Sequence, residues 1–418
     1  MRKAVRIALV VLTVALAVAG SAGGGAEPAG TGFVQDGAKL TVAGKGYFGS
    51  SVALSADGAT GLIGAPADKP AGAAYVVTRS PSGWTRPGVK LLATGAEGHG
   101  FLPNFGQTVA LSADGNTAVV GAPDDDHEKG AVWVFTRSDS GWTQQGPKLT
   151  GRGERGVGDG RGGRFGQTLA LSDDGNTLAI GADWDDHSRG AVWVFRRVGS
   201  AWKQQGSKLT THDKTADGRF GISVAVSADA TTLLVGRFGN EHSRAGALVF
   251  TDSGSGWTLR ATLTAPAVFG GSGFFGSSLA LSADGNTALI GYGQGAAWVF
   301  SRAGSTWRRP GTNLARQGKT SSDKFGGSLA LSADGSTALV GAPSYSNDAG
   351  AVWVFTRSGS TWRQQGTRLT GGGELIERDG GFGRSVALSD DATTVLVGGT
   401  GPGLQDAPGA VWAFRAQP

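Results

Sequence analysis

The sequence predicts an all-β protein, a seven-bladed β-propeller of four-stranded blades whose last blade is closed by the N-terminal strand. A Phe-Gly pair heads seven similar units, and each unit contains short strand-forming segments. The last unit lacks a fourth segment, and the amino-terminal region supplies one. The 418 residues include 74 glycines and only 14 prolines, which is typical of many tight turns between short strands.

The spacing of the units fits a propeller. Successive Phe-Gly pairs are 57, 60, 55, 55, 50 and 57 residues apart, which suits one four-stranded blade with generous loops. The pairs begin at Phe48, Phe105, Phe165, Phe220, Phe275, Phe325 and Phe382.

Residues 325–370 show the four strands of a unit most clearly: FGGSLALS, STALVGAP, GAVWVFTRS and STWRQQGTRLT. The first two are joined by a Ser-Ala-Asp-Gly segment, which favours a tight hairpin. In GAVWVF, Val352 and Val354 face one side of the sheet, and Trp353 and Phe355 face the other. A strand that is apolar on both faces must be covered twice, as in sheets stacked around an axis.

The tryptophans follow the same register, since eleven of the twelve occur at two repeat positions. The third-strand position holds Trp133, Trp193, Trp298, Trp353 and Trp412, and the start of the fourth strand holds Trp84, Trp142, Trp202, Trp257, Trp307 and Trp362. We expect these side chains to form the core between blades. A row of sugar-stacking platforms is the alternative. Trp184 lies outside the pattern, in a loop, and is a candidate for an exposed contact.

The ends of the chain complete one blade. The seventh unit stops at Pro418 without a fourth strand, whereas GFVQDGAKLTV near the amino terminus matches the end of that strand. We therefore predict that residues 33–42 form the outer strand of the last blade, within a propeller domain of residues 31–418.

The first 26 residues are expected to be a secretory signal peptide, with three positive charges before an apolar run too short to cross a bilayer. A membrane anchor is the alternative. Removing Arg2, Lys3 and Arg6 lowers the formal net charge from +5 to +2, so a nucleic acid partner is not implied. The chain has no cysteine, which excludes disulfides and thiolate chemistry. We expect a secreted protein, extracellular or in the cell envelope, with no membrane span after cleavage.

Phe-Gly at the head of each unit and Gly-Ala-Pro after its second strand, as at Gly64-Ala65-Pro66, resemble FG-GAP repeats, the units of the integrin α-chain head and of many secreted bacterial proteins. The resemblance implies a seven-bladed propeller used for extracellular recognition or adhesion. Integrin-type repeats often carry a calcium loop between the first two strands. Here that place holds only turns such as SADGNT, which offer too few oxygens for calcium. We expect no metal and no cofactor.

Binding is expected on the face formed by the second-to-third-strand loops and the inter-blade connections, because these loops vary between units. The loops at residues 122–132 and 182–192 each combine acidic residues with a histidine, and the second also contains Trp184. The loop at residues 239–248 contains His242. A divalent metal is one hypothesis for them, and solvated turns are the favoured alternative. The connection 151–164 is mildly positive and is expected to contact an anionic glycan or a cell-wall polymer. Its Gly-x-Gly-x-x-Gly leads into a strand, which argues against a dinucleotide site. The candidates are Asp124, Asp125, Asp126, His127, Trp184, Asp185, Asp186, His187, His242, Arg152, Arg155, Arg161 and Arg164.

The sequence contains no recognisable catalytic motif, such as Gly-x-Ser-x-Gly or His-Glu-x-x-His. We therefore predict a non-enzymatic scaffold that recognises an extracellular protein or a surface polysaccharide. The alternatives are a polysaccharide lyase or hydrolase with its site at the channel mouth, and a propeller lectin.

Overall fold

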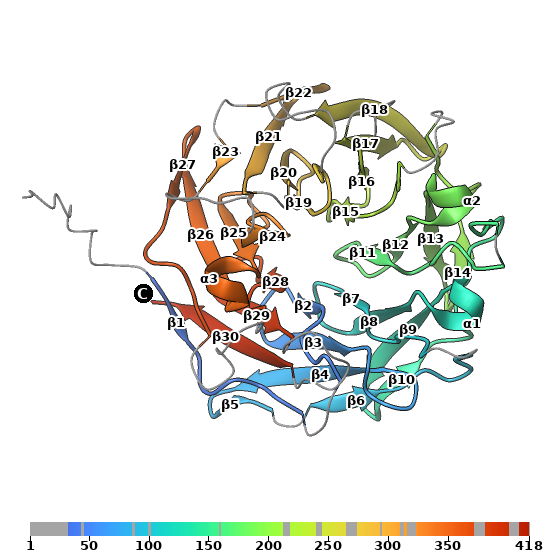
Figure 1. The fold of residues 1–418 in the computed structure, drawn as a ribbon, viewed down its shortest axis with the longest axis horizontal. Coiled ribbons are helices and arrows are strands. Elements are labelled where there is room, and N and C mark those ends of the chain that lie inside the picture. Colours follow the sequence, from blue (N-terminus) through green and yellow to red (C-terminus); the bar gives the residue numbers. More distant parts are fainter. Residues whose placement is uncertain are drawn as a thin grey trace, which may run out of the picture.

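The computed structural model describes residues 32–42, 46–85, 88–98, 102–158, 160–211, 218–239, 245–264, 274–292, 295–309, 313–315, 323–371, 381–400 and 409–417. Figure 1 shows these strands as seven antiparallel sheets arranged around a central axis, which confirms the predicted fold class. The predicted signal peptide, residues 1–26, lies outside the described ranges. No helix within those ranges is long and apolar enough to span a bilayer.

The blades are numbered from Phe48. Blade 1 contains β2 (Val52–Leu54), β3 (Thr60–Ala65), β4 (Ala73–Ser80), β5 (Gly83–Trp84) and β6 (Val89–Leu91). Blade 2 contains β7 (Thr108–Leu111), β8 (Thr117–Ala122), β9 (Ala131–Ser138) and β10 (Gly141–Gln144). Blade 3 contains β11 (Thr168–Leu171), β12 (Thr177–Ala182), β13 (Ala191–Val198) and β14 (Ala201–Gln204). Blade 4 contains β15 (Val224–Val226), β16 (Thr232–Arg237), β17 (Gly246–Asp252) and β18 (Trp257–Thr264).

Blade 5 contains β19 (Leu279–Leu281), β20 (Thr287–Gly291), β21 (Ala297–Ala303), β22 (Thr306–Arg308) and β23 (Asn313–Leu314). Blade 6 contains β24 (Ser328–Leu331), β25 (Thr337–Ala342), β26 (Ala351–Ser358) and β27 (Thr361–Gln364). Blade 7 contains β28 (Ser385–Leu388), β29 (Thr394–Gly399), β30 (Ala410–Ala416) and β1 (Phe33–Gln35).

The core lies between neighbouring blades, because the second and third strands are apolar on both sides. Trp193 and Ile180 of blade 3 pack with Val132 and Val134 of blade 2 in one buried cluster. In six blades the phenylalanine of the Phe-Gly pair meets the aromatic residue at the tryptophan position of the third strand edge to face, as with Phe165 and Trp193, whose ring centroids are 5.3 Å apart. In blade 4, where that position holds Leu248, Phe220 meets Phe250 instead. The third-strand tryptophans are buried, as predicted. Among the fourth-strand tryptophans, Trp84 and Trp362 are buried. The other four are half-buried, because the fourth strand is the outer strand of its sheet and has solvent on one side: Trp142, Trp202, Trp257 and Trp307.

The predicted ring closure is confirmed. β1 pairs antiparallel with β30, and Phe33 lies opposite Ala416. Leu40 then returns to the same strand through a bridge to Val411. The strand is interrupted between these points by a turn in which Gln35 Nε2 donates a hydrogen bond to the Gly37 carbonyl, 2.8 Å. The same amide-to-glycine bond recurs at Gln144, Gln204 and Gln364, so the amino-terminal segment copies the outer strand of blades 2, 3 and 6.

One face of the ring carries the hairpins between the first and second strands, and we call it the hairpin face. In the hairpin of blade 2, Ser112 Oγ accepts a hydrogen bond from Thr117 N, 2.9 Å, and donates one to Asp114 Oδ1, 2.5 Å. Backbone bonds then join neighbouring hairpins, as from Ala56 N to Ala113 O, 2.9 Å. The Asp114 oxygens are therefore used within the hairpin itself.

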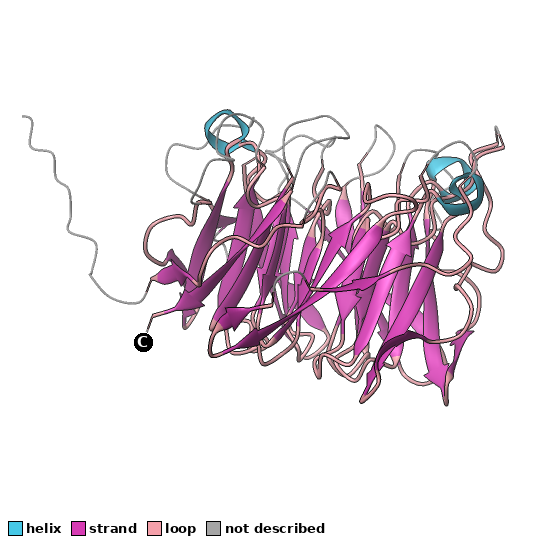
Figure 2. Ribbon diagram, turned by 90° about the horizontal axis from the view of Figure 1, so that it is seen from below, coloured by secondary structure: helices cyan, strands magenta, loops and turns pink. Residues whose placement is uncertain are grey.

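The opposite face, which we call the loop face, carries short helical elements (Figure 2). They are α1 (Asp125–Glu128), α2 (Asp185–Ser188) and α3 (Tyr345–Asp348), between the second and third strands of blades 2, 3 and 6. In α1, Asp126, His127 and Glu128 have φ values of 46°, 58° and 63°, so the turn is left-handed. Asp, Asn and His tolerate this conformation better than most residues, and these loops are rich in them.

Candidate functional site

The left-handed turns tie blades 2, 3 and 6 to the blade that follows each of them on the loop face. In α1 they direct carbonyl groups towards the following connection: the Glu128 carbonyl accepts a hydrogen bond from Arg164 N, 2.8 Å, and the Lys129 carbonyl accepts one from Phe165 N, 2.9 Å. In α2 the Ser188 carbonyl accepts a hydrogen bond from Arg219 N, 2.9 Å. The turns therefore position Arg164 and Arg219, the residues immediately before two of the Phe-Gly pairs.

Two of the predicted site residues are buried anchors of these loops. Asp125 is 1% exposed, accepts a hydrogen bond from Glu97 N at 2.6 Å and lies 2.7 Å from Lys148 Nζ. Asp185 is fully buried, pairs with Lys208 and accepts a hydrogen bond from Arg155 N at 2.7 Å. Burial raises the pKa of Asp185 above the ordinary aspartate value, and Lys208 opposes that shift. Neither carboxylate is presented to solvent, so both act on the position of the loops.

The adjoining acid and histidine pairs face solvent. Asp126 Oδ2 lies 3.0 Å from Lys129 Nζ, and this hydrogen bond lowers the pKa of Asp126. His127 Nδ1 is 3.3 Å from Asp126 Oδ1, and His187 Nδ1 is 3.7 Å from Asp186 Oδ1. His242 lies outside the described residues. Within the described part of the chain, no three His, Asp or Glu residues form a group that could hold a metal.

The most concentrated feature of the loop face is an arginine cluster around Trp184, made of Arg161, Arg164 and Arg219. Their guanidinium carbons lie 5.4, 4.8 and 5.9 Å from the centroid of the indole ring. These distances are within the range of cation–π attraction. Trp184 is half-buried beneath the cluster rather than fully exposed, and it links the connection before blade 3 to the connection before blade 4.

Carboxylates lie below the arginines and hold them. Asp124 Oδ1 accepts hydrogen bonds from Nε and Nη2 of Arg164, at 3.0 and 2.7 Å. Asp183 lies 3.6 Å from Arg219 and Glu128 lies 3.9 Å from Arg161. In these pairs the arginine is the more exposed partner, with side-chain exposures of 51% for Arg161 against 21% for Glu128, and 39% for Arg219 against 3% for Asp183. The outer layer of the cluster is therefore cationic.

Asp183 holds Arg219 only loosely. Burial raises its pKa, against the lowering effect of Arg219 and then of Arg164. Its Oδ1 is buried and accepts no hydrogen bond from a described residue. The Arg219 side chain makes no hydrogen bond of its own within the described ranges, so its N–H groups remain available to an anionic ligand.

Aromatic rings extend the cluster towards blade 5. Arg219 lies 5.8 Å from the ring centroid of Phe238, and Phe238 meets Phe274 edge to face at 5.2 Å. Phe274 is 49% exposed. On the other side, the side chains of Arg152 and Arg155 are exposed, while the Arg152 carbonyl accepts a hydrogen bond from Trp193 Nε1, 3.0 Å.

The sequence predicts part of this arrangement. Trp184, Arg161 and Arg164 are among the predicted site residues, whereas Arg219 and Asp183 are not. Arg219 stands immediately before a Phe-Gly pair, the same repeat position as Arg164, and Asp183 replaces the proline of Gly-Ala-Pro. The shared repeat position of Arg164 and Arg219 was the available signal.

Fold and repeats together define the class of the protein as a seven-bladed propeller with Phe-Gly and Gly-Ala-Pro units. The model of the FG-GAP repeat family matches residues 89–135, which span β6 to β9. With the seven blades of Figure 1, this match confirms that the chain is a propeller carrying FG-GAP repeats. The match does not extend to the integrin likeness, which stays a prediction.

Among solved structures, the chain is similar to a proposed 6-phosphogluconolactonase from Bacteroides uniformis. The alignment has a TM-score of 0.52 and 14% sequence identity, and it covers 77% of this chain and 85% of the other. At this identity the likeness concerns the fold alone. No curated protein matches the sequence.

Proposed function

We propose that this protein is a secreted recognition propeller that binds an acidic extracellular polymer through the arginine cluster on the loop face of blades 2 to 4. The observation that carries the proposal is the convergence of Arg161, Arg164 and Arg219 on one indole, each arginine being more exposed than the carboxylate it pairs with. Guanidinium groups bind carboxylates and sulfates through paired hydrogen bonds, and a half-exposed indole offers a surface for a sugar ring.

The shape of the surface favours an extended ligand. Cations and aromatic rings run from Arg152 and Arg155 in the connection before blade 3, across Trp184, to Phe238 and Phe274 near blade 5. A chain with repeated negative charges would contact several of these groups at once. The FG-GAP units agree with an extracellular setting, and the amino-terminal charge and apolar run support export.

The proposal is for binding without catalysis. Its support is the sequence, in which no nucleophile and base are joined by a recognised motif. The observed partners of Asp125, Asp185 and Asp124 also give these carboxylates structural tasks.

Binding to polygalacturonate and to neutral dextran tests the proposal, with the affinity measured at several salt concentrations. We expect binding to polygalacturonate alone, weakening as salt rises because exposed charges are screened. The double variant Arg161→Gln/Arg219→Asn should weaken binding about tenfold, since hydrogen bonds to charged groups are lost. Asparagine suits position 219 because Asn104 holds the equivalent place with a similar positive φ.

Arg363→Gln, an exposed change on β27 away from the cluster, serves as the matched control. Equal binding of dextran, or unchanged affinity of the folded double variant, would overturn the proposed site. Release of new reducing ends from polygalacturonate would show that the protein is an enzyme.

A further inference from the structure

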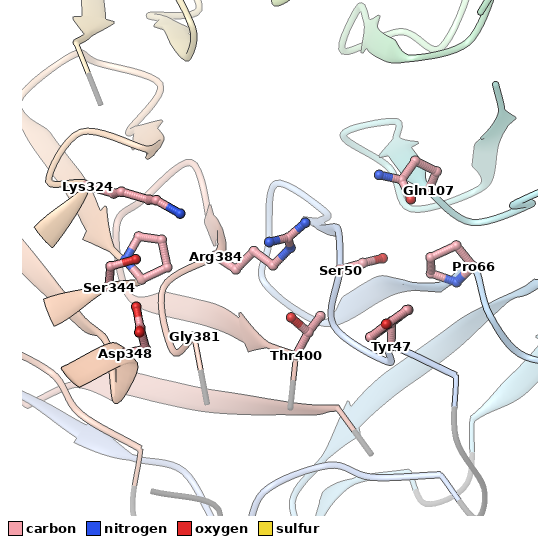
Figure 3. A pocket seen from close by; sticks show the side chains of 11 residues that line it. Tyr47, Ser50, Pro66, Gln107, Lys324, Ser344, Asp348, Gly381, Arg384 and Thr400 are labelled. Atoms are coloured by element: carbon pink, nitrogen blue, oxygen red, sulfur yellow. The ribbon is translucent and has the colours of Figure 1, made fainter. Parts of the chain in front are cut away.

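A polar cavity lies at the mouth of the central channel, on the side of the loop face away from the arginine cluster. It has a volume of about 580 Å³ and is lined by residues of blades 1, 2, 6 and 7. This volume is within the usual range of small-molecule sites. Figure 3 shows its lining, with Arg384 between Lys324 on one side and Ser50 on the other.

Two cations share this cavity. Lys324 and Arg384 are exposed, and neither side chain has an ion-pair or hydrogen-bond partner within the described ranges. In Figure 3 the ammonium group of Lys324 points towards the side of Arg384. The Arg384 guanidinium group lies on the side of Ser50, so the two positive charges line different parts of one cavity, and an anion bound between them would be attracted by both.

Arg384 departs from the repeat. It directly follows the Phe-Gly pair of blade 7, and this position lies one or two residues before the innermost strand of each blade. The other six blades have uncharged residues there: Ser50, Gln107, Gln167, Ile222, Ser277 and Gly327. The fold therefore tolerates many residues at this position, and the charge in blade 7 is not needed to build the blade.

The rest of the lining suits a hydroxylated ligand. Ser50, Ser344 and Thr400 bring hydroxyl groups, and Gln107 brings an amide. Asp348 contributes one formal negative charge against the two positive charges of Lys324 and Arg384. The cavity thus has a formal charge of +1, which matches a ligand with one negative charge.

We propose that this cavity binds an acidic sugar, with its carboxylate between Arg384 and Lys324 and its hydroxyl groups on the serine, threonine, glutamine and aspartate side chains. Arginine and carboxylate have complementary geometry, and the carboxylate of a uronic acid carries the single charge that the cavity matches. This site is separate from the arginine cluster and does not rest on the function proposed above.

Calorimetric titration of the whole protein with monomeric galacturonate and glucuronate tests this assignment. Galactose lacks the acid, and acetate lacks the sugar, so each tests whether that part of the ligand is needed. Galactose 1-phosphate tests whether the site prefers a single negative charge. Arg384→Gln introduces glutamine, which blades 2 and 3 have at the equivalent position. Lys324→Asn introduces asparagine, which blade 2 has at the equivalent position with a similar positive φ. Both variants should therefore fold.

We expect one of the two uronic acids to bind at least about tenfold more tightly than galactose or acetate. Arg384→Gln should weaken it about tenfold and Lys324→Asn severalfold, while the Arg161→Gln/Arg219→Asn variant of the other site should bind it unchanged. Equal binding of acetate, tighter binding of galactose 1-phosphate, or unchanged affinity of a folded Arg384→Gln variant would overturn the assignment.

Discussion

The two faces of the propeller are built by different kinds of interaction. On the hairpin face every turn follows Ser-x-Asp-x-x-Thr, from Ser55 to Thr60 in blade 1 up to Ser389 to Thr394 in blade 7. Its hydrogen bonds join residues at most five positions apart within a hairpin. On the loop face the key contacts are long-range, as between Asp185 and Lys208 or Arg164 and Asp124. Local bonds make one face uniform, and long-range pairs let the other face differ from blade to blade.

The largest expected effect lies on the loop face. Asp185→Ala removes a fully buried carboxylate and leaves Lys208 and Arg155 N without their partner. We expect a loss of about 3–5 kcal/mol in the free energy of unfolding, since removing one partner of a buried ion pair leaves the other charge unpaired. Urea unfolding of the variant and the parent measures this loss. Adding Lys208→Met should recover part of the loss, and a loss below 1 kcal/mol would count against the anchoring role.

A smaller and uniform effect is expected on the hairpin face. Ser112→Ala removes the acceptor of Thr117 N, a buried group, and the donor to Asp114. The free energy of unfolding should fall by about 1–2 kcal/mol. Ser282→Ala and Ser332→Ala should give similar values in the same assay, because their hairpins repeat the same bonds. Widely different values among the three would break the comparison between the faces.

The smallest effect concerns two residues of the hairpin face that differ from the repeat. Asp173 and Asp390 stand where the other five hairpins have alanine. Partial burial raises the pKa of both, and the like charge of Asp390 raises that of Asp173 further. The folded protein therefore holds these protons more tightly than the unfolded chain. The resulting stability is present below pH 3.8, the ordinary aspartate value, and is lost as pH rises through the raised values.

Asp173→Ala should accordingly raise stability slightly at pH 7, by less than about 0.5 kcal/mol, as is usual for a partly exposed position. The advantage should disappear below the ordinary aspartate pKa. Thermal melts of both proteins across this pH range check the sign. A variant less stable than the parent at pH 7 would show that Asp173 has a favourable partner.

The same contrast explains what could be predicted from the sequence. The blade count, the strands and the ring closure follow from local patterns that repeat, so self-comparison was sufficient. The loop face was predicted only in part. Asp125 and Asp185 were predicted to be surface acids because their lysine partners lie 23 residues further along the chain, just after the outer strand. Arg219 was missed because it meets Trp184 only after the chain has passed to the next blade.

The pairing of Phe33 with Ala416 also bears on how the molecule could be rearranged. The polypeptide is topologically a circle that has been cut once, inside a sheet instead of at a boundary between sheets. A short linker that joins Ala416 directly to Phe33 would restore the circle, and new termini could then be introduced on the opposite side of the axis. The protein should thus tolerate circular permutation.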